Sequence, residues 1–308
     1  MSNEKLTVNT DKWPREGHND PLIIRTTETE RSIQIESNTT VTYPSNKQLL
    51  HPKEYCLKYH IYEKVRKLKI NNDKVLLASY GGAQEPNEKY DLENKLFYNI
   101  GSGAFSGIFR DFPKEAAFQM ASKPDNGKYL YKYEIITEQE VKNKLDKKTL
   151  LVKWENISIG GALPQNADAY YISLRSANVR VANDSNDAPG ENEVMRYSSE
   201  PYEKSFGIKI ELTVPESNKT SHPVSVIKHL LDGVICAFHG EKAGLAEIFS
   251  EKIKNAGEDW NILGPCEYLR KHGNGVQWNP EDNRLQFGWI IVNKGTEYKM
   301  SGKIYKWD

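Results

Sequence analysis

The feature that most constrains the fold is an apolar helical pattern between His222 and Gly240, HPVSVIKHLLDGVICAFHG. At about 100° per residue, its apolar side chains fall on one broad face, which a helix buries against a core. Pro223 suits the first turn of a helix, where its missing N–H costs nothing. Gly240 suits the position after the last turn. We therefore expect a helix over 223–239 that packs on a core.

The opposite face of this expected helix carries polar residues of an unusual kind. Steps of three and four residues align Ser225, His229, Asp232, Cys236 and His239. Such side chains can ligate a metal, accept protons or act as nucleophiles, whereas a solvated face normally carries Lys and Glu. The functional interpretation makes His229, Asp232 and His239 catalytic. The structural interpretation is a helix buried on both sides, which also favours small, weakly polar residues.

A second candidate site lies in the acidic segment before the apolar run KLFYNI. Asp91 and Glu93 are two residues apart, so a strand would place both carboxylates on one face. Paired carboxylates can hold Mg²⁺ or Mn²⁺, and Asp232 is the third candidate ligand. A divalent metal is therefore a candidate cofactor. The alternative is an exposed acidic loop before a strand.

A basic and aromatic helix is expected over 53–68. Lys64, Arg66 and Lys67 belong to a basic series that is interleaved with tyrosines. Basic residues beside aromatic ones can follow a nucleic-acid backbone and stack on its bases, so these three residues are candidates for holding phosphates. The alternative is a solvated basic face with tyrosines at its edges.

No nucleotide cofactor is evident from the glycine-rich segments. Gly101, Gly103 and Gly107 have the spacing G-x-G-x3-G, which departs by one residue from the dinucleotide-binding fingerprint. The phosphate-loop pattern G-x4-G-K-[ST] does not occur in the sequence.

Composition narrows the class of protein. The 308 residues suffice for one large domain or two ordinary ones. Lys plus Arg and Asp plus Glu number 42 each, so the net charge of zero gives no global electrostatic case for nucleic acid or an anionic membrane. No apolar run approaches the ~20 residues of a membrane span, and the polar first residues do not resemble a secretory signal. Three scattered cysteines do not indicate a disulfide framework, so we expect a soluble cytoplasmic protein.

These patterns predict an α+β protein with a mixed or mainly antiparallel sheet and a C-terminus rich in β-hairpins. Helices at 53–68, 223–239 and 242–255 are expected to pack on the sheet. Two lobes are expected. The first is a β-rich N-terminal lobe over 1–145, and the second is an α+β lobe over 146–308. A single domain is the alternative.

Shorter segments carry expectations of their own. Residues 1–20 are expected to be a polar tail or early loop. A short helix is expected over 111–122, a strand over 169–177 and a small helix over 265–272.

Two functions are consistent with these residues. The first is a metal-assisted hydrolase acting on nucleic acid or nucleotides, in which Asp91, Glu93 and Asp232 hold the ion while His229 or His239 transfers protons. The second is a non-enzymatic binding or assembly protein, such as a subunit or inhibitor in a bacterial or phage complex, because tyrosines, tryptophans and polar loops suit protein recognition. The sequence leaves substrate, partner and oligomeric state open.

Overall fold

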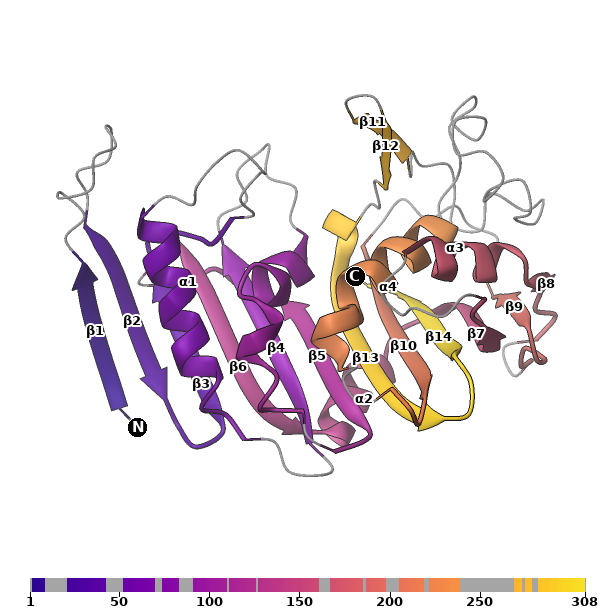
Figure 1. Ribbon diagram of the computed structural model, residues 1–308, viewed down its shortest axis with the longest axis horizontal. Coiled ribbons are helices and arrows are strands. Elements are labelled where there is room, and N and C mark those ends of the chain that lie inside the picture. The colour runs from indigo at the N-terminus through magenta and orange to yellow at the C-terminus, as the bar shows by residue number, and fades with distance from the viewer. Residues whose placement is uncertain are drawn as a thin grey trace. The chain divides into compact units, whose positions relative to one another are not determined.

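The chain divides into two compact units in a computed structural model. Unit 1 consists of Met1–Asp111 and Glu115–Lys142, and unit 2 of Phe112–Lys114 and Asn143–Asp308. Each unit contributes six sheet strands with helices packed against them (Figure 1). The fold is α+β with a mixed, mostly antiparallel sheet, as the sequence predicted. The structure describes residues 2–8, 21–42, 52–69, 74–82, 91–109, 111–125, 127–160, 167–184, 187–197, 205–218, 222–238, 269–272, 275–278 and 282–307.

The strands of unit 1 lie in the order β1-β2-β3-β6-β4-β5. Neighbours are antiparallel except β4 and β5, which run parallel. Buried and half-buried residues alternate along β3, as expected for a strand with one face on the core. The strand bounds are β1 Ser2–Val8, β2 Leu22–Glu28, β3 Ser32–Ser37, β4 Lys74–Gly82, β5 Lys114–Met120 and β6 Tyr129–Thr137.

Helix α1 (Pro52–Val65) covers one face of the unit 1 sheet (Figure 1). Its buried residues Leu57, Ile61 and Val65 recur every four residues and form the stripe that packs on the core. Between β4 and β5 the chain forms two short helices, η1 (Asn94–Tyr98) and η2 (Ser102–Ala104), which contact β4 and α1 respectively.

The strands of unit 2 lie in the order β13-β10-β14-β7-β9-β8. β10 runs parallel to β13 and β8 parallel to β9, and the other neighbours are antiparallel. β13 and β14 follow one another in the chain, but β10 lies between them. Two further strands, β11 and β12, form a separate antiparallel pair. The strand bounds are β7 Leu150–Ser158, β8 Asn178–Val181, β9 Glu193–Arg196, β10 Phe206–Pro215, β11 Leu269–His272, β12 Gly275–Trp278, β13 Leu285–Gly295 and β14 Lys299–Lys306.

Helices α3 (Ala167–Arg175) and α4 (Pro223–Phe238) pack on each other and on one face of the unit 2 sheet (Figure 1). The ring of Phe238 in α4 lies 5.1 Å from that of Trp154, so the helices cover the face of β7 that carries Trp154. The short helix η4 (Asp282–Arg284) precedes β13, and α2 (Glu138–Leu145) contains the division between the units.

The two units share one chain connectivity. In unit 1 the order along the chain is β3, α1, β4, the η1 and η2 segment, β5 and β6. In unit 2 it is β7, α3, β10, α4, β13 and β14, with β8 and β9 inserted after α3 and with β11, β12 and η4 inserted after α4. The lateral orders β3-β6-β4-β5 and β7-β14-β10-β13 correspond strand by strand. The last two strands of each order, β4 and β5 in unit 1 and β10 and β13 in unit 2, are parallel, so each unit needs a crossover segment between them.

Several local predictions were wrong. The predicted strand 169–177 is helix α3, because Ala167, Tyr170, Tyr171 and Leu174 recur with helical spacing and are all buried. The predicted helix over 111–122 is strand β5.

The predictions for the N-terminus and for residues 265–272 were also wrong, because each segment contains a strand. The expected N-terminal tail contains strand β1, which pairs with β2 along its whole length. The small helix expected over 265–272 contains strand β11. The predicted helix at 242–255 lies outside the described residues.

Among the described helices, none has the length and apolar character that spanning a membrane requires.

Candidate functional site

The polar side of α4 does not assemble a set of free catalytic groups in the described part of the helix. Ser225 lies in the first turn of the helix, where its hydroxyl donates a hydrogen bond to the His222 carbonyl at 2.7 Å. His229 is exposed, whereas Cys236 is 1% exposed. Asp232 forms an ion pair with Lys228, one turn earlier, at 3.0 Å. His239, the remaining member, lies outside the described residues.

Helix α3 explains the small residues on α4. A Cβ on Gly233 would lie 2.3 Å from the carbonyl oxygen of Ala167 and 2.9 Å from Cβ of Tyr170, so only glycine fits this contact. The Arg175 guanidinium donates to the carbonyl of Ala237, near the end of α4, at 3.2 Å. Helix α4 therefore contacts α3 at Gly233 and Ala237 in addition to the sheet, while His229 stays exposed.

Asp91 and Glu93 do not lie on a strand. Leu92 and Glu93 are helical, and residues two apart on a helix point to different sides, so the expected pairing on one strand face is wrong. Asp91 accepts a hydrogen bond from the Asn94 amide at 2.6 Å, and Glu93 is fully buried. Among the described residues, no three His, Cys, Asp or Glu side chains come together as metal ligands. The metal-binding role of Asp91, Glu93 and Asp232 stays a prediction.

The basic residues of α1 and the turn after it differ in their surroundings. Lys64 forms ion pairs with Glu4 of β1 and Glu28 of β2, and only 14% of its side chain is exposed. These pairs tie α1 to the sheet edge. Arg66 is exposed and pairs with Glu63 at 3.0 Å, and Lys67 is exposed. Their role in holding nucleic acid stays a prediction.

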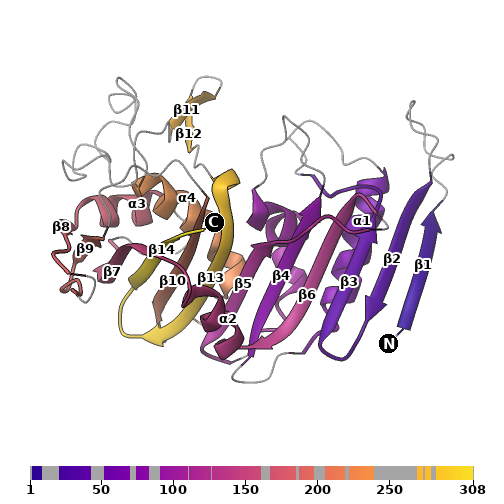
Figure 2. The same cartoon turned by 180° about the vertical axis from the view of Figure 1, so that it is seen from behind.

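Four residues of unit 2 form a continuous row across the sheet. The strand register pairs Trp289 with Lys209, Lys209 with Lys303, and Lys303 with Lys153. Paired residues share a face, and these alternate with Trp154 and its neighbours, which face α4. The row therefore lies on the face that α3 and α4 leave uncovered, which is turned toward the viewer in Figure 2. We call Lys153, Lys209 and Lys303 the lysine row.

The members of the lysine row differ in their ion pairs. Lys153 pairs with Glu155 and Lys209 with Glu211, each at 2.5 Å and each two residues along the same strand. Lys303, between them, has no ion pair among the described residues. Burial lowers the pKa of Lys303, the ammonium groups of Lys153 and Lys209 lower it further, and Glu211 and Glu155 oppose them.

The lysine row borders a hollow of about 320 Å³. A β-bulge shapes one side of it. Asn156 has a left-handed backbone with φ of 52°, and its N–H donates to the Ser301 hydroxyl at 2.9 Å. The register of β7 against β14 shifts at this point. Such bulges redirect side chains and are common beside functional sites.

Aromatic rings border the other side of the lysine row. The Lys209 ammonium lies 4.5 Å from the ring centre of Trp289. Phe287, two residues earlier on the same face, stacks on Trp307 at 4.9 Å with an angle of 6° between the rings. Trp307 covers Gly207, where a Cβ would lie 2.6 Å from the ring. These rings limit water access at one end of the row and support the stem of Lys209.

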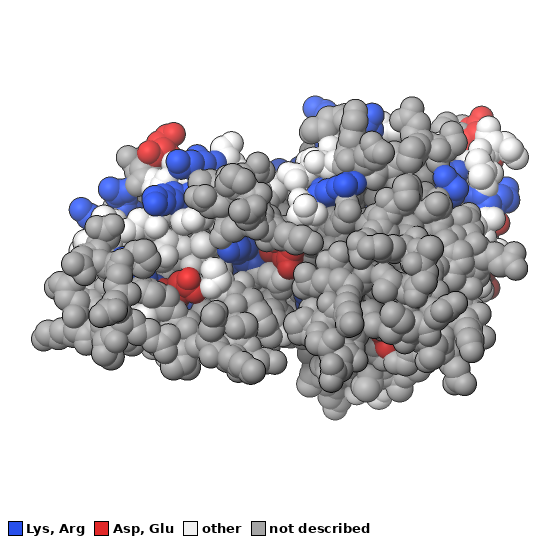
Figure 3. Space-filling view, turned by 90° about the horizontal axis from the view of Figure 1, so that it is seen from above, with Lys and Arg blue, Asp and Glu red and all other residues white. Residues whose placement is uncertain are grey.

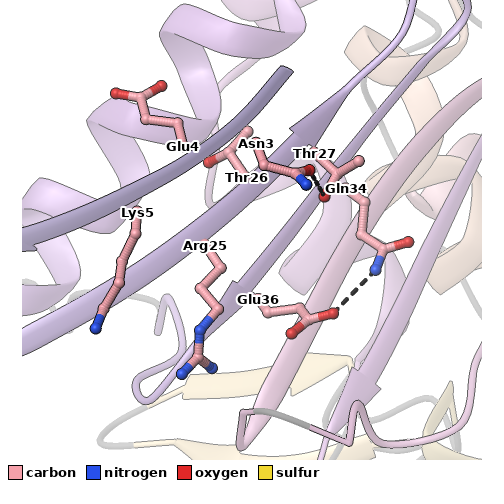
Figure 4. Close-up of a pocket in the computed structure, with 8 residues that line it drawn as sticks. All are labelled: Asn3, Glu4, Lys5, Arg25, Thr26, Thr27, Gln34 and Glu36. Carbon is pink, nitrogen blue, oxygen red and sulfur yellow. Dashed lines mark hydrogen bonds between the residues drawn. The ribbon is translucent and has the colours of Figure 1, made fainter. Parts of the chain in front are cut away.

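Unit 1 has a hollow of about 310 Å³ on its own helix-free face (Figure 4). Its groups are largely paired with each other. Thr27 donates to Asn3 at 3.1 Å, and the Gln34 amide donates to Glu36 at 3.0 Å. Lys5 and Arg25 extend to the same side in Figure 4, with Glu36 beside Arg25. Its two cations, Lys5 and Arg25, are fewer than the three of the lysine row, and Glu4 and Glu36 also line the hollow.

Figure 3 shows a further side of the molecule. The described Lys and Arg side chains lie there in separate groups, with Asp and Glu among them. The described part of this side therefore forms no continuous field of one sign, in keeping with the net charge of zero.

No protein-family model, no curated protein and no solved structure matches this chain. Function therefore has to be inferred from the chemistry of the site. Sequence reasoning missed the lysine row because its members are separated by more than fifty residues along the chain. A signal was present in KWE and KIE, where Lys and Glu alternate on a strand, but only the register brings the three lysines together.

Proposed function

We propose that this protein binds a small phosphate-bearing molecule at the lysine row. The single observation that carries the proposal is the register of Lys209, Lys303 and Lys153, which puts three ammonium groups side by side on neighbouring strands. The proposed function is binding of a ligand, not catalysis of a reaction.

Charge balance favours an anion at this position. Two carboxylates, those of Glu155 and Glu211, accompany three lysines in the lining of the hollow. A phosphate dianion can accept hydrogen bonds from several ammonium groups at once, and charge-assisted hydrogen bonds are about twice as strong as neutral ones. It would also relieve the repulsion among the three lysines.

The size of the hollow favours a small molecule over a polymer. Its volume of about 320 Å³ is near the lower end for small-molecule sites. The neighbouring Trp289 is 1% exposed, so its ring is not available for stacking on a nucleic-acid base.

Calorimetric titration of the full chain with inorganic phosphate, at neutral pH and low ionic strength, tests the proposal. We expect a dissociation constant on the order of 1 mM. Lys303→Gln is expected to weaken binding about tenfold, or about 1.4 kcal/mol. Affinity is expected to fall as salt is added, because screening weakens exposed charge interactions.

The matched control is Lys132→Gln in unit 1. Lys132 lies on β6, which corresponds to β14, and pairs with Glu134 at 2.7 Å. Phosphate affinity is expected to be unchanged in this variant. Equal affinity of Lys303→Gln and the native chain, or no phosphate binding by the native chain, would exclude the lysine row as the site. Tighter binding of acetate would identify a carboxylate ligand instead, and much tighter binding of a thymidine decamer than of phosphate would identify nucleic acid.

A further inference from the structure

The central position of Lys303 sets its amine apart from the other two amines of the row. Lys153 and Lys209 each lie beside a carboxylate two residues away on their own strand. Ser301 occupies the corresponding position on β14. Its neutral hydroxyl does not stabilise the ammonium form of Lys303 as a carboxylate would. The strand register places an ammonium group on each side of Lys303.

This arrangement lowers the pKa of one particular amine, that of Lys303. Two neighbouring positive charges and partial burial both disfavour an ammonium group. The charged and titratable groups that face Lys303 are Lys153 and Lys209, which lower its pKa, and Glu155 and Glu211, which raise it. A lysine next to other cationic groups is a recognised form of activated nucleophile, because the free amine is the reactive species.

We propose that Lys303 forms a reversible imine with an aldehyde or ketone group of the phosphate-bearing ligand. This inference rests on the proposed function, because the phosphate seated on Lys153 and Lys209 would hold the carbonyl carbon near Nζ of Lys303. It adds an activity to the site, namely reversible covalent capture of a phosphorylated carbonyl compound.

The step balances without an oxidant or reductant. The lone pair of the neutral Nζ attacks the carbonyl carbon, the C=O π electrons move to oxygen, and transfer of a proton from nitrogen to oxygen gives a carbinolamine. Loss of the hydroxyl group with the remaining N–H proton, as one water molecule, then forms the C=N bond. Glu155 or Glu211, both in the lining of the hollow, can relay these protons.

Reductive trapping tests the inference. The full chain is incubated at neutral pH with glycolaldehyde phosphate and cyanoborohydride, which reduces an imine to a stable secondary amine, and the modified lysine is identified by peptide mass spectrometry. We expect Lys303 to be the first lysine modified. Its modification is expected to be about tenfold faster with glycolaldehyde phosphate than with glycolaldehyde, because bound phosphate raises the local concentration of the aldehyde.

One variant and one internal control separate covalent chemistry from charge. Lys303→Arg keeps the positive charge but has no nucleophilic amine. It is expected to bind inorganic phosphate and to lose the fast modification. Lys132, which pairs with Glu134, is the internal control in the same digest and is expected to react at the rate of an ordinary surface lysine.

Different results would contradict the imine at Lys303 and the phosphate site at the lysine row. Phosphate binding by the native chain with uniform modification of all lysines, or with fast modification elsewhere in Lys303→Arg, would exclude the imine and leave the anion site intact. Fast modification of Lys303 that inorganic phosphate does not inhibit would show that the amine is activated without a phosphate site.

Discussion

Units 1 and 2 share the order of four strands but stabilise that order in different ways. The crossover between the parallel strands includes two short helical segments in unit 1, whereas that of unit 2 includes the sixteen-residue helix α4 and the strand pair β11 and β12. Strand order can be kept while the crossover changes, because the backbone hydrogen bonds of the sheet do not depend on which side chains cover its faces. Crossovers and uncovered faces are therefore where the two units differ in chemistry.

The two units also differ in the buried contacts that stabilise them. In unit 1 the buried Thr40 hydroxyl lies 3.0 Å from the hydroxyl of Tyr80 and 2.9 Å from that of Tyr131, which also accepts the Val41 N–H at 2.9 Å. In unit 2, α3 and α4 meet through a glycine contact at Gly233. Unit 1 thus contains a buried polar network, whereas the packing of α3 on α4 in unit 2 depends on a close contact at Gly233.

The largest effect is expected from Gly233→Val in unit 2. A side chain there would meet the backbone of α3, so we expect a loss of about 3 kcal/mol of stability. Urea unfolding followed by tryptophan fluorescence measures this loss, because Trp154, Trp278, Trp289 and Trp307 belong to unit 2. The control is Gly107→Val in unit 1, where a Cβ meets nothing within 4 Å. An equal loss in both variants would contradict close packing as the distinguishing feature of unit 2.

An effect of nearly the same size is expected from acid on unit 2. Burial, aided by Lys114, lowers the pKa of His222 from its ordinary 6.5 to about 4. Because the folded state binds the proton less tightly than the unfolded state, the stability is complete above pH 6.5 and falls as the pH drops toward 4. The loss amounts to about 3 kcal/mol.

Unfolding curves between pH 7 and pH 4 check this dependence on His222. His222→Asn keeps an acceptor for the Ser225 N–H and is expected to flatten the curve. In unit 1, burial and Lys64 lower the pKa of His60, but Glu4 and Glu28 raise it, so the acid sensitivity there is expected to be weaker. An unchanged slope in His222→Asn would exclude His222 as the group responsible.

A moderate effect is expected from Tyr131→Phe in unit 1. The variant leaves the Val41 N–H and the Thr40 hydroxyl without a partner they have in the native chain, which costs about 2 kcal/mol. Hydrogen exchange of the β6 amides measures the loss within unit 1. Protection as strong as in the native chain would mean that the network does not stabilise unit 1.

The smallest effect is expected from the exposed side of α1. Tyr55 and Tyr59 are 57% and 58% exposed, so replacing both with serine is expected to change stability by less than about 0.5 kcal/mol. Thermal melting compares this variant with Tyr131→Phe. A large loss would show that these tyrosines are covered in the folded protein.

The fold class and two helices could be predicted because they depend on local patterns. The stripe of Leu57, Ile61 and Val65 predicted α1, and the apolar face of 223–239 predicted α4 within one residue of its bounds. The segment 169–177 was predicted to be a strand, because its pair of tyrosines suits a strand by propensity, whereas its apolar spacing suits the helix that the structure has there. Packing outweighed the strand propensity of this segment, because Tyr170 is buried against Gly233 of α4.

Candidate sites could be predicted less well, because a site depends on contacts between distant segments. The sequence by itself determined the apolar face of α4, the zero net charge and the alternation of Lys and Glu along β7 and β10. Only the tertiary structure decided that α3 packs on α4 at Gly233, that Lys64 is held by Glu4 and Glu28, and that Lys303 lies between Lys209 and Lys153. The physical reason is that periodicity fixes which face a residue occupies, whereas strand order and register fix which residues become its neighbours.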